Sequence, residues 1–93
     1  MPRPKLPRFI RFSPGVLYFK PRGIPLFELE EVVLLPEETE ALKLYDVDSL
    51  DQTASAKRMK VSQPTFARII TSAHKKIAKA IIKGYAIRLE KTP

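Results

Sequence analysis

Side chains that can recognise a nucleic-acid base gather in one short stretch, "MKVSQPTFARI", from Met59 to Ile69. Arginine pairs with two acceptors of guanine in a major groove, and glutamine and threonine bond other base edges there. On a helix over this stretch, Pro64 and Arg68 share the outward face, with Gln63 and Thr65 beside them. Proline offers an apolar surface suited to a thymine methyl group. The sequence therefore predicts base contacts by Gln63, Pro64, Thr65 and Arg68.

Basic and polar side chains on both sides of this stretch are suited to phosphate contacts, which position a protein on a duplex without reading its sequence. The predicted phosphate contacts are Gln52, Thr53, Lys57, Arg58, Lys60, Ser62, Lys75, Lys76 and Lys79. A solvated lysine face is ordinary for a surface helix, but this one continues directly from a turn motif. A basic N-terminal arm with Arg3, Lys5 and Arg8 is expected to enter a minor groove.

Charge is segregated along the chain, which carries a net charge of +7. Residues 1–23 hold six basic and no acidic side chains, residues 24–51 nine acidic and one basic, and residues 52–93 ten basic and one acidic. Two basic blocks around an acidic one indicate a polyanionic partner for the basic blocks and another role for the middle. The alternative is that the acidic block only neutralises the basic blocks within the fold.

Residue types that support catalysis or metal binding are scarce. The chain has one histidine, His74, no cysteine and no Gly-rich phosphate loop. His74 lies at the edge of an apolar helical stripe, where a boundary residue is commoner than a base or a ligand. The acidic residues crowd at a helix start, where capping and the helix dipole account for them. The prediction is a protein that is not an enzyme and has no catalytic residue, cofactor or metal.

Two short helices are expected to precede the base-contacting stretch. Pro36 suits the first position of a helix because its missing N–H has no partner there, and this helix should end near Asp46. A second helix fits Gln52–Met59, with Asp51 as its cap. The 93 residues of the chain allow one domain with a single modest core.

The third helix is expected to begin at the proline-containing stretch. N–H groups of a first turn have no acceptor within the helix, so Pro64 marks the start of this helix and does not break it. Ser62 or Gln63 caps the helix, and Gln63 is preferred because proline pushes the preceding residue toward an extended backbone. The helix should continue to Lys83 and stop at Gly84. Its expected apolar face holds Phe66, Ile70, Ala73, Ile77 and Ile81.

The second and third helices together match a helix-turn-helix pattern. Ala56 is the small residue that lets the third helix approach, and Val61 is the apolar residue of the turn. Phe66 and Ile69 are the apolar anchors of the third helix. Glycine is usual in such a turn because the backbone takes a positive φ, and Lys60 in that conformation costs about 1 kcal/mol.

Short strands are expected near the two ends of the chain. Six prolines in the first 25 residues exclude a helix there. "RFIRFS", Arg8–Ser13, alternates as a strand does and is a natural partner for "YAIRLE", Tyr85–Glu90. The conformation of residues 14–27 is left open. The predicted fold is mainly α, with a basic arm and short strands over 1–34 and a helix-turn-helix domain over 35–93.

Six segments occur in a fixed order over nearly the whole chain. They are "MPRP", "YFKPRGIPL", "LEEVVL", "EALKL", "KRMKVSQPTFARI" and "KGYAIRL". With them the chain resembles a family of short, uncharacterised bacterial and archaeal proteins with a helix-turn-helix like that of sigma-factor region 4. The resemblance implies a three-helix sigma region-4-like domain and sequence-specific DNA binding.

The chain departs from this family pattern in three places. Lys60 stands where glycine is usual, and Pro64 stands where a polar residue is usual. The second helix, "QTASAKRM", lacks the acidic residues common there, which should strengthen attraction to phosphate. Some members also have cysteine in the N-terminal basic segment, and its absence here puts a redox or metal-sensing role in doubt.

The leading hypothesis is a sequence-specific DNA-binding protein, a transcriptional regulator whose reading helix starts at Ser62–Pro64. The alternative is an interaction module that docks RNA polymerase or another protein through the acidic segment 28–40 and binds DNA weakly. RNA binding is disfavoured because few aromatic residues accompany the basic helix.

The assembly and location follow from two further features of the sequence. The third helix is longer than one reading helix needs, which predicts a homodimer through its C-terminal part and the terminal strands. No apolar run is long enough to cross a membrane, and the Pro-rich N-terminus is unlike a secretory signal. A cytoplasmic protein without a membrane partner is expected.

Overall fold

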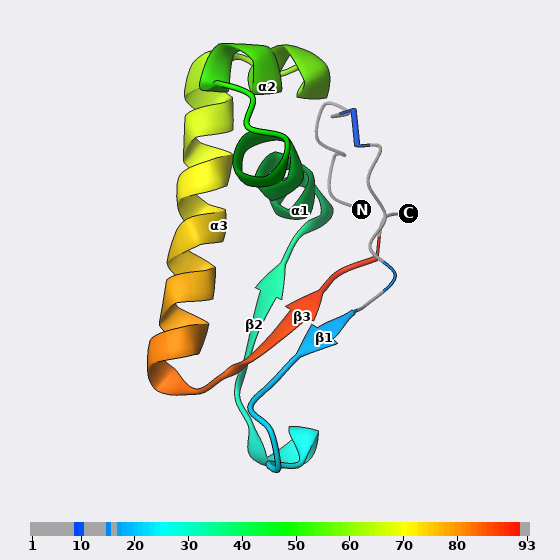
Figure 1. Ribbon diagram of the computed structural model, residues 1–93, viewed down its shortest axis with the longest axis vertical. Coiled ribbons are helices and arrows are strands. Elements are labelled where there is room, and N and C mark those ends of the chain that lie inside the picture. Colours follow the sequence, from blue (N-terminus) through cyan, green and yellow to red (C-terminus); the bar gives the residue numbers. More distant parts are fainter. Residues whose placement is uncertain (1–8, 11–14, 16, 92–93) are drawn as a thin grey trace, which may run out of the picture.

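The computed structural model describes residues 9, 10, 15 and 17–91, and within them the protein is mainly α with short strands, as predicted (Figure 1). The three helices are α1 (Pro36–Leu42), α2 (Gln52–Met59) and α3 (Gln63–Lys83). The strands are β1 (Tyr18–Phe19), β2 (Glu31–Leu34) and β3 (Ala86–Leu89). A 3-10 turn covers Leu26–Glu28, and a π-helical segment, Lys43–Val47, continues α1.

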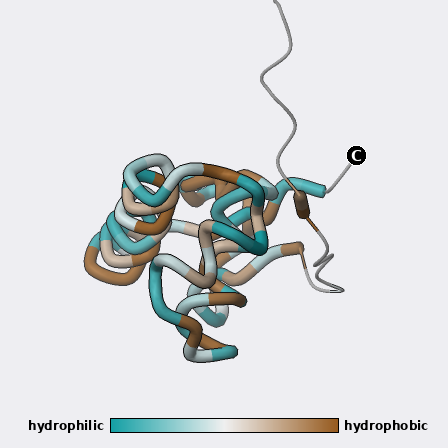
Figure 2. The backbone as a smooth tube through the Cα atoms, turned by 90° about the horizontal axis from the view of Figure 1, so that it is seen from above, coloured by the Kyte–Doolittle hydropathy of each residue, from teal (hydrophilic) through white to brown (hydrophobic). Residues whose placement is uncertain are grey.

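The long helix α3 runs along one side of the molecule and joins two unlike halves (Figure 1). At its N-terminal end α1 and α2 pack against it, and at its C-terminal end the sheet does. The sheet has the order β1-β3-β2, with β3 antiparallel to β1 and parallel to β2. Seen along the long axis of the molecule, the helical coils carry both hydrophobic and hydrophilic residues, as amphipathic helices do (Figure 2).

The helices begin close to where their capping residues predict. Pro36 is the first residue of α1, and the Asp51 side chain accepts a hydrogen bond from the Ala54 N–H at 2.7 Å at the start of α2. The cap of α3 is Ser62, whose Oγ accepts from the Thr65 N–H at 3.2 Å. The preference for Gln63 as the cap is therefore wrong. The short serine hydroxyl reaches the N–H three residues on, and Pro64 fits the second helical position.

Two left-handed residues end α2 and α3. Lys60 has φ 56° and ψ 44°, which confirms the positive φ expected in the turn. Gly84 has φ 71° and closes α3 after Lys83, as predicted. The conformational free-energy cost is higher at the end of α2 than at the end of α3, because glycine adopts a left-handed backbone freely and lysine does not.

The core has two clusters. The first lies among the three helices and contains Ala41, Leu44, Ala56, Met59, Phe66, Ile69 and Ile70. The second lies between α3 and the sheet and contains Leu34, Ala73 and Leu89, with Ile77 and Ile87 packed against it. The expected apolar face of α3 is correct except at Ile81, which is 69% exposed while Ala80 is buried. The chain turns back after Gly84, and the Tyr85 N–H donates to the Ala80 carbonyl, which puts Ala80 on the covered side.

The predicted C-terminal strand is confirmed, but its pairing differs from the prediction. Of Arg8–Ser13 only Phe9 and Ile10 are among the described residues, and neither is in a strand. The antiparallel partner of β3 is Tyr18–Phe19, and its parallel partner is Glu31–Leu34. In β2 only the last residue, Leu34, is buried, and Glu31 at its start is exposed.

Candidate nucleic-acid interface

The turn between α2 and α3 is closed by backbone hydrogen bonds. The Lys60 N–H donates to the carbonyls of Ala56 and Lys57, and the Val61 N–H donates to the Ala56 carbonyl at 3.0 Å. Met59 and Phe66, on either side of the turn, are fully buried. Backbone closure and buried anchors on both sides fix the start of α3 relative to α2.

The four residues predicted to contact bases lie together on the first two turns of α3. Gln63, Pro64 and Arg68 are exposed, and Thr65 is half-buried. Arg68 Nη2 donates to Thr65 Oγ1 at 3.3 Å, and Thr65 Oγ1 also accepts from Ser62 Oγ at 2.9 Å. The Thr65 hydroxyl therefore links the Arg68 guanidinium to the Ser62 side chain at the start of α3.

Two helices contribute to this surface. Thr53 on α2 donates its hydroxyl to Gln63 Oε1 at 3.5 Å, a long hydrogen bond that links α2 to the first residue of α3. Thr53, Lys57, Arg58, Lys60 and Ser62 are exposed, and Gln52 is half-buried. Cationic and hydroxyl groups thus border the predicted base-contacting residues on the α2 side, a composition suited to phosphate contacts.

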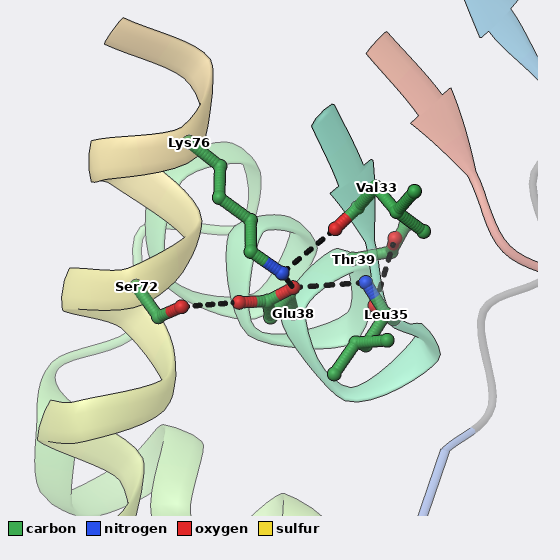
Figure 3. Close-up of polar contacts among 6 residues, drawn as sticks. All are labelled: Val33, Leu35, Glu38, Thr39, Ser72 and Lys76. Atoms are coloured by element: carbon green, nitrogen blue, oxygen red, sulfur yellow. Dashed lines mark hydrogen bonds and ion pairs between the residues drawn. The ribbon is translucent and has the colours of Figure 1, made fainter. Parts of the chain in front are cut away.

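Further along α3 the predicted phosphate contacts separate into two kinds. Lys75 and Lys79 are exposed, and the Lys79 ammonium lies 6.0 Å from the centre of the Tyr85 ring. Lys76 instead points inward, where Nζ donates to Glu38 Oε1 and to the Val33 carbonyl, both at 2.7 Å (Figure 3). Its ammonium is committed within the fold, so Lys76 does not belong to the candidate interface.

The partner of Lys76 is a buried carboxylate. The Glu38 side chain is 4% exposed and accepts from the Leu35 N–H at 2.9 Å and from Ser72 Oγ at 2.6 Å (Figure 3). A carboxylate so far from water requires a cation and hydrogen-bond donors. The spacing of lysines along α3 could not show that Lys76 points inward while Lys75 stays exposed. The acceptors that bind the Lys76 ammonium lie on β2 and α1, which are distant in the sequence.

A shallow hollow of about 320 Å³ lies beside the guanidinium of Arg68. It lies between the start of α1 and α3, and its lining is Leu35, Glu37, Glu38, Thr65, Arg68, Ile69, Ser72 and Lys76. The Lys76 ammonium offsets the charge of Glu38 within it. The hollow borders the predicted base-contacting residues on the α1 side, a boundary that sequence reasoning missed because the two segments are distant in the chain.

Phe9, the first described residue, contacts the turn between α2 and α3. The Phe9 N–H donates to the Met59 carbonyl at 3.0 Å, and the Lys60 ammonium lies 4.9 Å from the centre of the Phe9 ring. Phe9 therefore occupies an α2 carbonyl that the helix itself leaves without a donor. The predicted arm residues Arg3, Lys5 and Arg8 lie outside the described residues.

Much of the acidic block is engaged inside the fold. Glu38 and Glu40 are buried, and Glu31 pairs with Arg88 at 3.3 Å. A hydrogen bond to the Glu30 carboxylate raises the pKa of the Tyr85 phenol above its ordinary value. Several acidic side chains of segment 28–40, the predicted docking surface, are therefore buried or paired within the fold.

The other ionic contacts lie beyond α1. Lys43 pairs with Asp48 at 2.7 Å, and His74 Nε2 lies 2.6 Å from Asp46 Oδ2 on the surface. His74 is thus a boundary residue of α3. Within residues 9, 10, 15 and 17–91, no three metal-binding side chains come together. In the same part of the chain, no helix has the length and apolar character needed to cross a bilayer.

Comparison with known proteins places the chain in a family. The family described as "Protein of unknown function DUF134" matches residues 1–92. The chain belongs to the DUF134 family. No solved structure matches it.

Curated relatives of this DUF134 chain are named "UPF0251 protein". Those from Caldanaerobacter subterraneus, Moorella thermoacetica and Dehalococcoides mccartyi are 58%, 56% and 50% identical to it over 90 residues. Each alignment covers 97% of this chain, and it covers 76%, 60% and 77% of the respective relatives. The chain therefore spans only part of the length of these proteins.

Proposed function

We propose that this DUF134 protein binds double-stranded DNA sequence-specifically and regulates transcription, with the start of α3 in the major groove. One observation carries the proposal. A closed turn with Lys60 in the left-handed conformation joins α2 to a capped α3 and presents Gln63, Pro64 and Arg68 to solvent. In a helix-turn-helix of the sigma region-4 kind, these positions contact base edges.

The length of α3 suggests that base contacts and phosphate contacts would lie on different parts of the helix. The helix has 21 residues and is about 31 Å long, whereas a groove accepts only the first turns of a reading helix. Arg68 would pair with a guanine, and Gln63 and Thr65 would bond neighbouring base edges. Lys75 and Lys79, further along, would contact the phosphate backbone.

Phosphate contacts would flank the reading helix. Gln52, Thr53, Lys57 and Arg58 of α2, with Lys60 and Ser62 of the turn, border the base-contacting residues. Arg3, Lys5 and Arg8 would follow the duplex from Phe9, whose backbone is bound at the turn. Because this binding replaces counterions on DNA, affinity should fall steeply with salt.

Two copies are proposed to act together in the cytoplasm, where the DNA of a prokaryotic cell lies. Regulators that read the major groove in this way commonly bind two half-sites about one helical turn apart. Docking of RNA polymerase through segment 28–40 remains the second proposal. It is less favoured because Glu38 and Glu40 are buried and Glu31 is paired with Arg88.

Selection of bound fragments from random double-stranded DNA tests the proposal. The wild-type protein should enrich one motif, and Arg68→Ala should lose the preference at one position of it. Lys75→Ala is the matched control, since it removes one exposed cation from the same helix and should leave the motif unchanged. A failure to enrich any motif, where a known regulator enriches its own, would favour the docking module.

A further inference from the structure

Strand β1 forms one edge of the sheet, and nothing among the described residues pairs with its outer side. Its inner side pairs with β3, where Phe19 lies opposite Ile87 and the Leu89 N–H donates to the Leu17 carbonyl at 2.7 Å. Backbone groups of an antiparallel strand point to alternate sides. The N–H and C=O of Tyr18 therefore point outward, away from β3.

One face of this edge is apolar. Phe19 pairs with Ile87, which packs on the α3 side of the sheet, and Leu17 shares that face by alternation. Phe19 is 55% exposed and lines a hollow of about 210 Å³. The other lining residues are Lys20, Pro21, Ala80, Ile81, Gly84, Tyr85 and Ile87. An open strand edge and an open apolar hollow thus lie side by side.

We propose that a second copy of the chain pairs with β1, antiparallel and across a two-fold axis, with Tyr18 opposite the partner's Tyr18. Two directly opposite residues of a hydrogen-bonded antiparallel pair exchange both of their N–H···O bonds. A two-fold axis sets a residue opposite itself, so the outward groups of Tyr18 satisfy each other. The two sheets become one sheet of six strands.

The side chains around Tyr18 suit this symmetric arrangement. Leu17 meets the partner's Phe19, and Phe19 meets the partner's Leu17, on the face that carries the hollow. An edge lysine commonly prevents such pairing. Here the Lys20 ammonium is bent back onto its own turn, where it donates to the carbonyls of Ile24 at 2.6 Å and Pro21 at 3.3 Å. The charge that would repel a second copy is thereby held away from the edge.

The position of the edge also leaves the candidate DNA interface uncovered. The sheet packs on the C-terminal part of α3, and the α2–α3 turn lies at the other end of that helix (Figure 1). Pairing through β1 therefore joins two copies without blocking either reading helix. The proposed dimer contact is inferred from the geometry of the sheet and does not depend on DNA binding, so the two can be tested separately.

Cysteine crosslinking tests the register, because the natural chain has no cysteine. In Tyr18→Cys the two thiols would meet at the two-fold axis, and Cα atoms of such a pair lie about 5.5 Å apart, within disulfide range. Val47→Cys is the control, with a residue 74% exposed beyond the sheet. Mild oxidation should convert most of Tyr18→Cys, and little of Val47→Cys, to covalent dimer. Equal crosslinking of both variants would overturn the proposal.

Sedimentation equilibrium tests the same contact without a crosslink. Tyr18→Pro removes the outward N–H and spares the bonds to β3, while Tyr18→Val keeps that N–H. Tyr18→Pro should raise the dimer dissociation constant about tenfold or more with an unchanged circular dichroism spectrum, and Tyr18→Val should change it much less. If Tyr18→Pro does not fold, the crosslinking result decides.

Two outcomes of sedimentation would refute the pairing. One is a wild-type protein that stays monomeric at about 50 µM, well above the micromolar range of specific association. The other is a dimer that persists in Tyr18→Pro but is lost in Ile82→Asp. Ile82 is exposed on the outer side of α3, so that result would assign the contact to the helix and not to the strand edge.

Discussion

The helical half of the protein, made of α1, α2 and the first turns of α3, contrasts with the sheet half, made of β1–β3 and the last turns of α3. In the helical half the capping contacts of Asp51 and Ser62 each span three residues. In the sheet half Glu31 and Arg88, on paired strands, are 57 residues apart. Local contacts form with little loss of chain entropy, and distant ones require long loops to close. The helix ends of the candidate DNA interface therefore depend on local contacts.

A cluster of polar contacts around Glu38 joins the two halves. Val33 of β2, Glu38 of α1 and Lys76 of α3 are joined by the ion pair and hydrogen bonds around Glu38 (Figure 3). Because Glu38 is nearly inaccessible to water, its removal affects both halves at once. Helix α3 is thus tied to α1 and to the sheet through a lysine that the sequence analysis predicted to contact phosphate.

The largest effect is expected in the core of the helical half. Phe66 is fully buried, so Phe66→Ala should lower the free energy of unfolding by about 3–5 kcal/mol. Leu89→Ala in the sheet half should cost about 2 kcal/mol, because Leu89 is 9% exposed at the border of its cluster. Urea denaturation followed by circular dichroism measures both. Equal losses would show that the two halves contribute alike to stability.

A smaller loss is expected at the contact between the halves. Glu38→Gln leaves the Lys76 ammonium without its counter-charge and should cost about 2–3 kcal/mol, since this lysine can still reach water. Glu28→Gln removes the same charge from an exposed position and should cost about 0.5 kcal/mol or less.

Hydrogen exchange of Glu38→Gln shows whether the halves uncouple. Amides of β2 and β3 should lose more protection than amides of α2, because the sheet loses its tie to α1. Uniform loss of protection would mean that the two halves unfold as one unit regardless of this contact.

Within α3, reading and phosphate contacts should separate in binding measurements. Arg68→Ala should weaken binding to the preferred site by about 1–3 kcal/mol and binding to a scrambled duplex much less. Lys75→Ala should weaken both duplexes by similar factors and lower the salt slope by about one charge. Both are measured across a salt series. If Arg68→Ala affects the two duplexes equally, Arg68 contacts phosphate, and specificity comes from Gln63, Thr65 or DNA shape.

The smallest effect concerns the turn. Lys60→Gly relieves the left-handed strain but removes a cation from the Phe9 ring, so stability should rise by only a few tenths of a kcal/mol while DNA affinity falls. In a Phe9→Ala background the same change should stabilise the fold by up to about 1 kcal/mol. Melting temperatures of the four proteins measure this cycle. A lower melting temperature for Lys60→Gly in both backgrounds would contradict the strain argument.

Short-range sequence signals were enough to predict where the helices begin and end. Pro36, Asp51 and Gly84 mark helix boundaries that depend only on neighbouring backbone groups, so they could be predicted without the fold. The positive φ of Lys60 was predictable for the same reason, because a turn this short between two helices requires it. The choice of Ser62 over Gln63 as the cap was missed, since both residues could supply an acceptor and only the geometry of the first turn selects one.

Contacts between segments distant in the sequence could be known only from the tertiary structure. Lys75 and Lys76 are adjacent and of one residue type, yet only Lys76 meets the carboxylate of Glu38 and the carbonyl of Val33. The exposure of Ile81 depends likewise on where the chain turns after Gly84. The amino-acid sequence by itself determined the helices, the turn and the cluster of residues suited to base contacts, because those follow from local backbone chemistry. The strand order, the inward position of Lys76 and, among the described residues, the unpaired outer side of β1 arise only when long loops close and bring distant segments together.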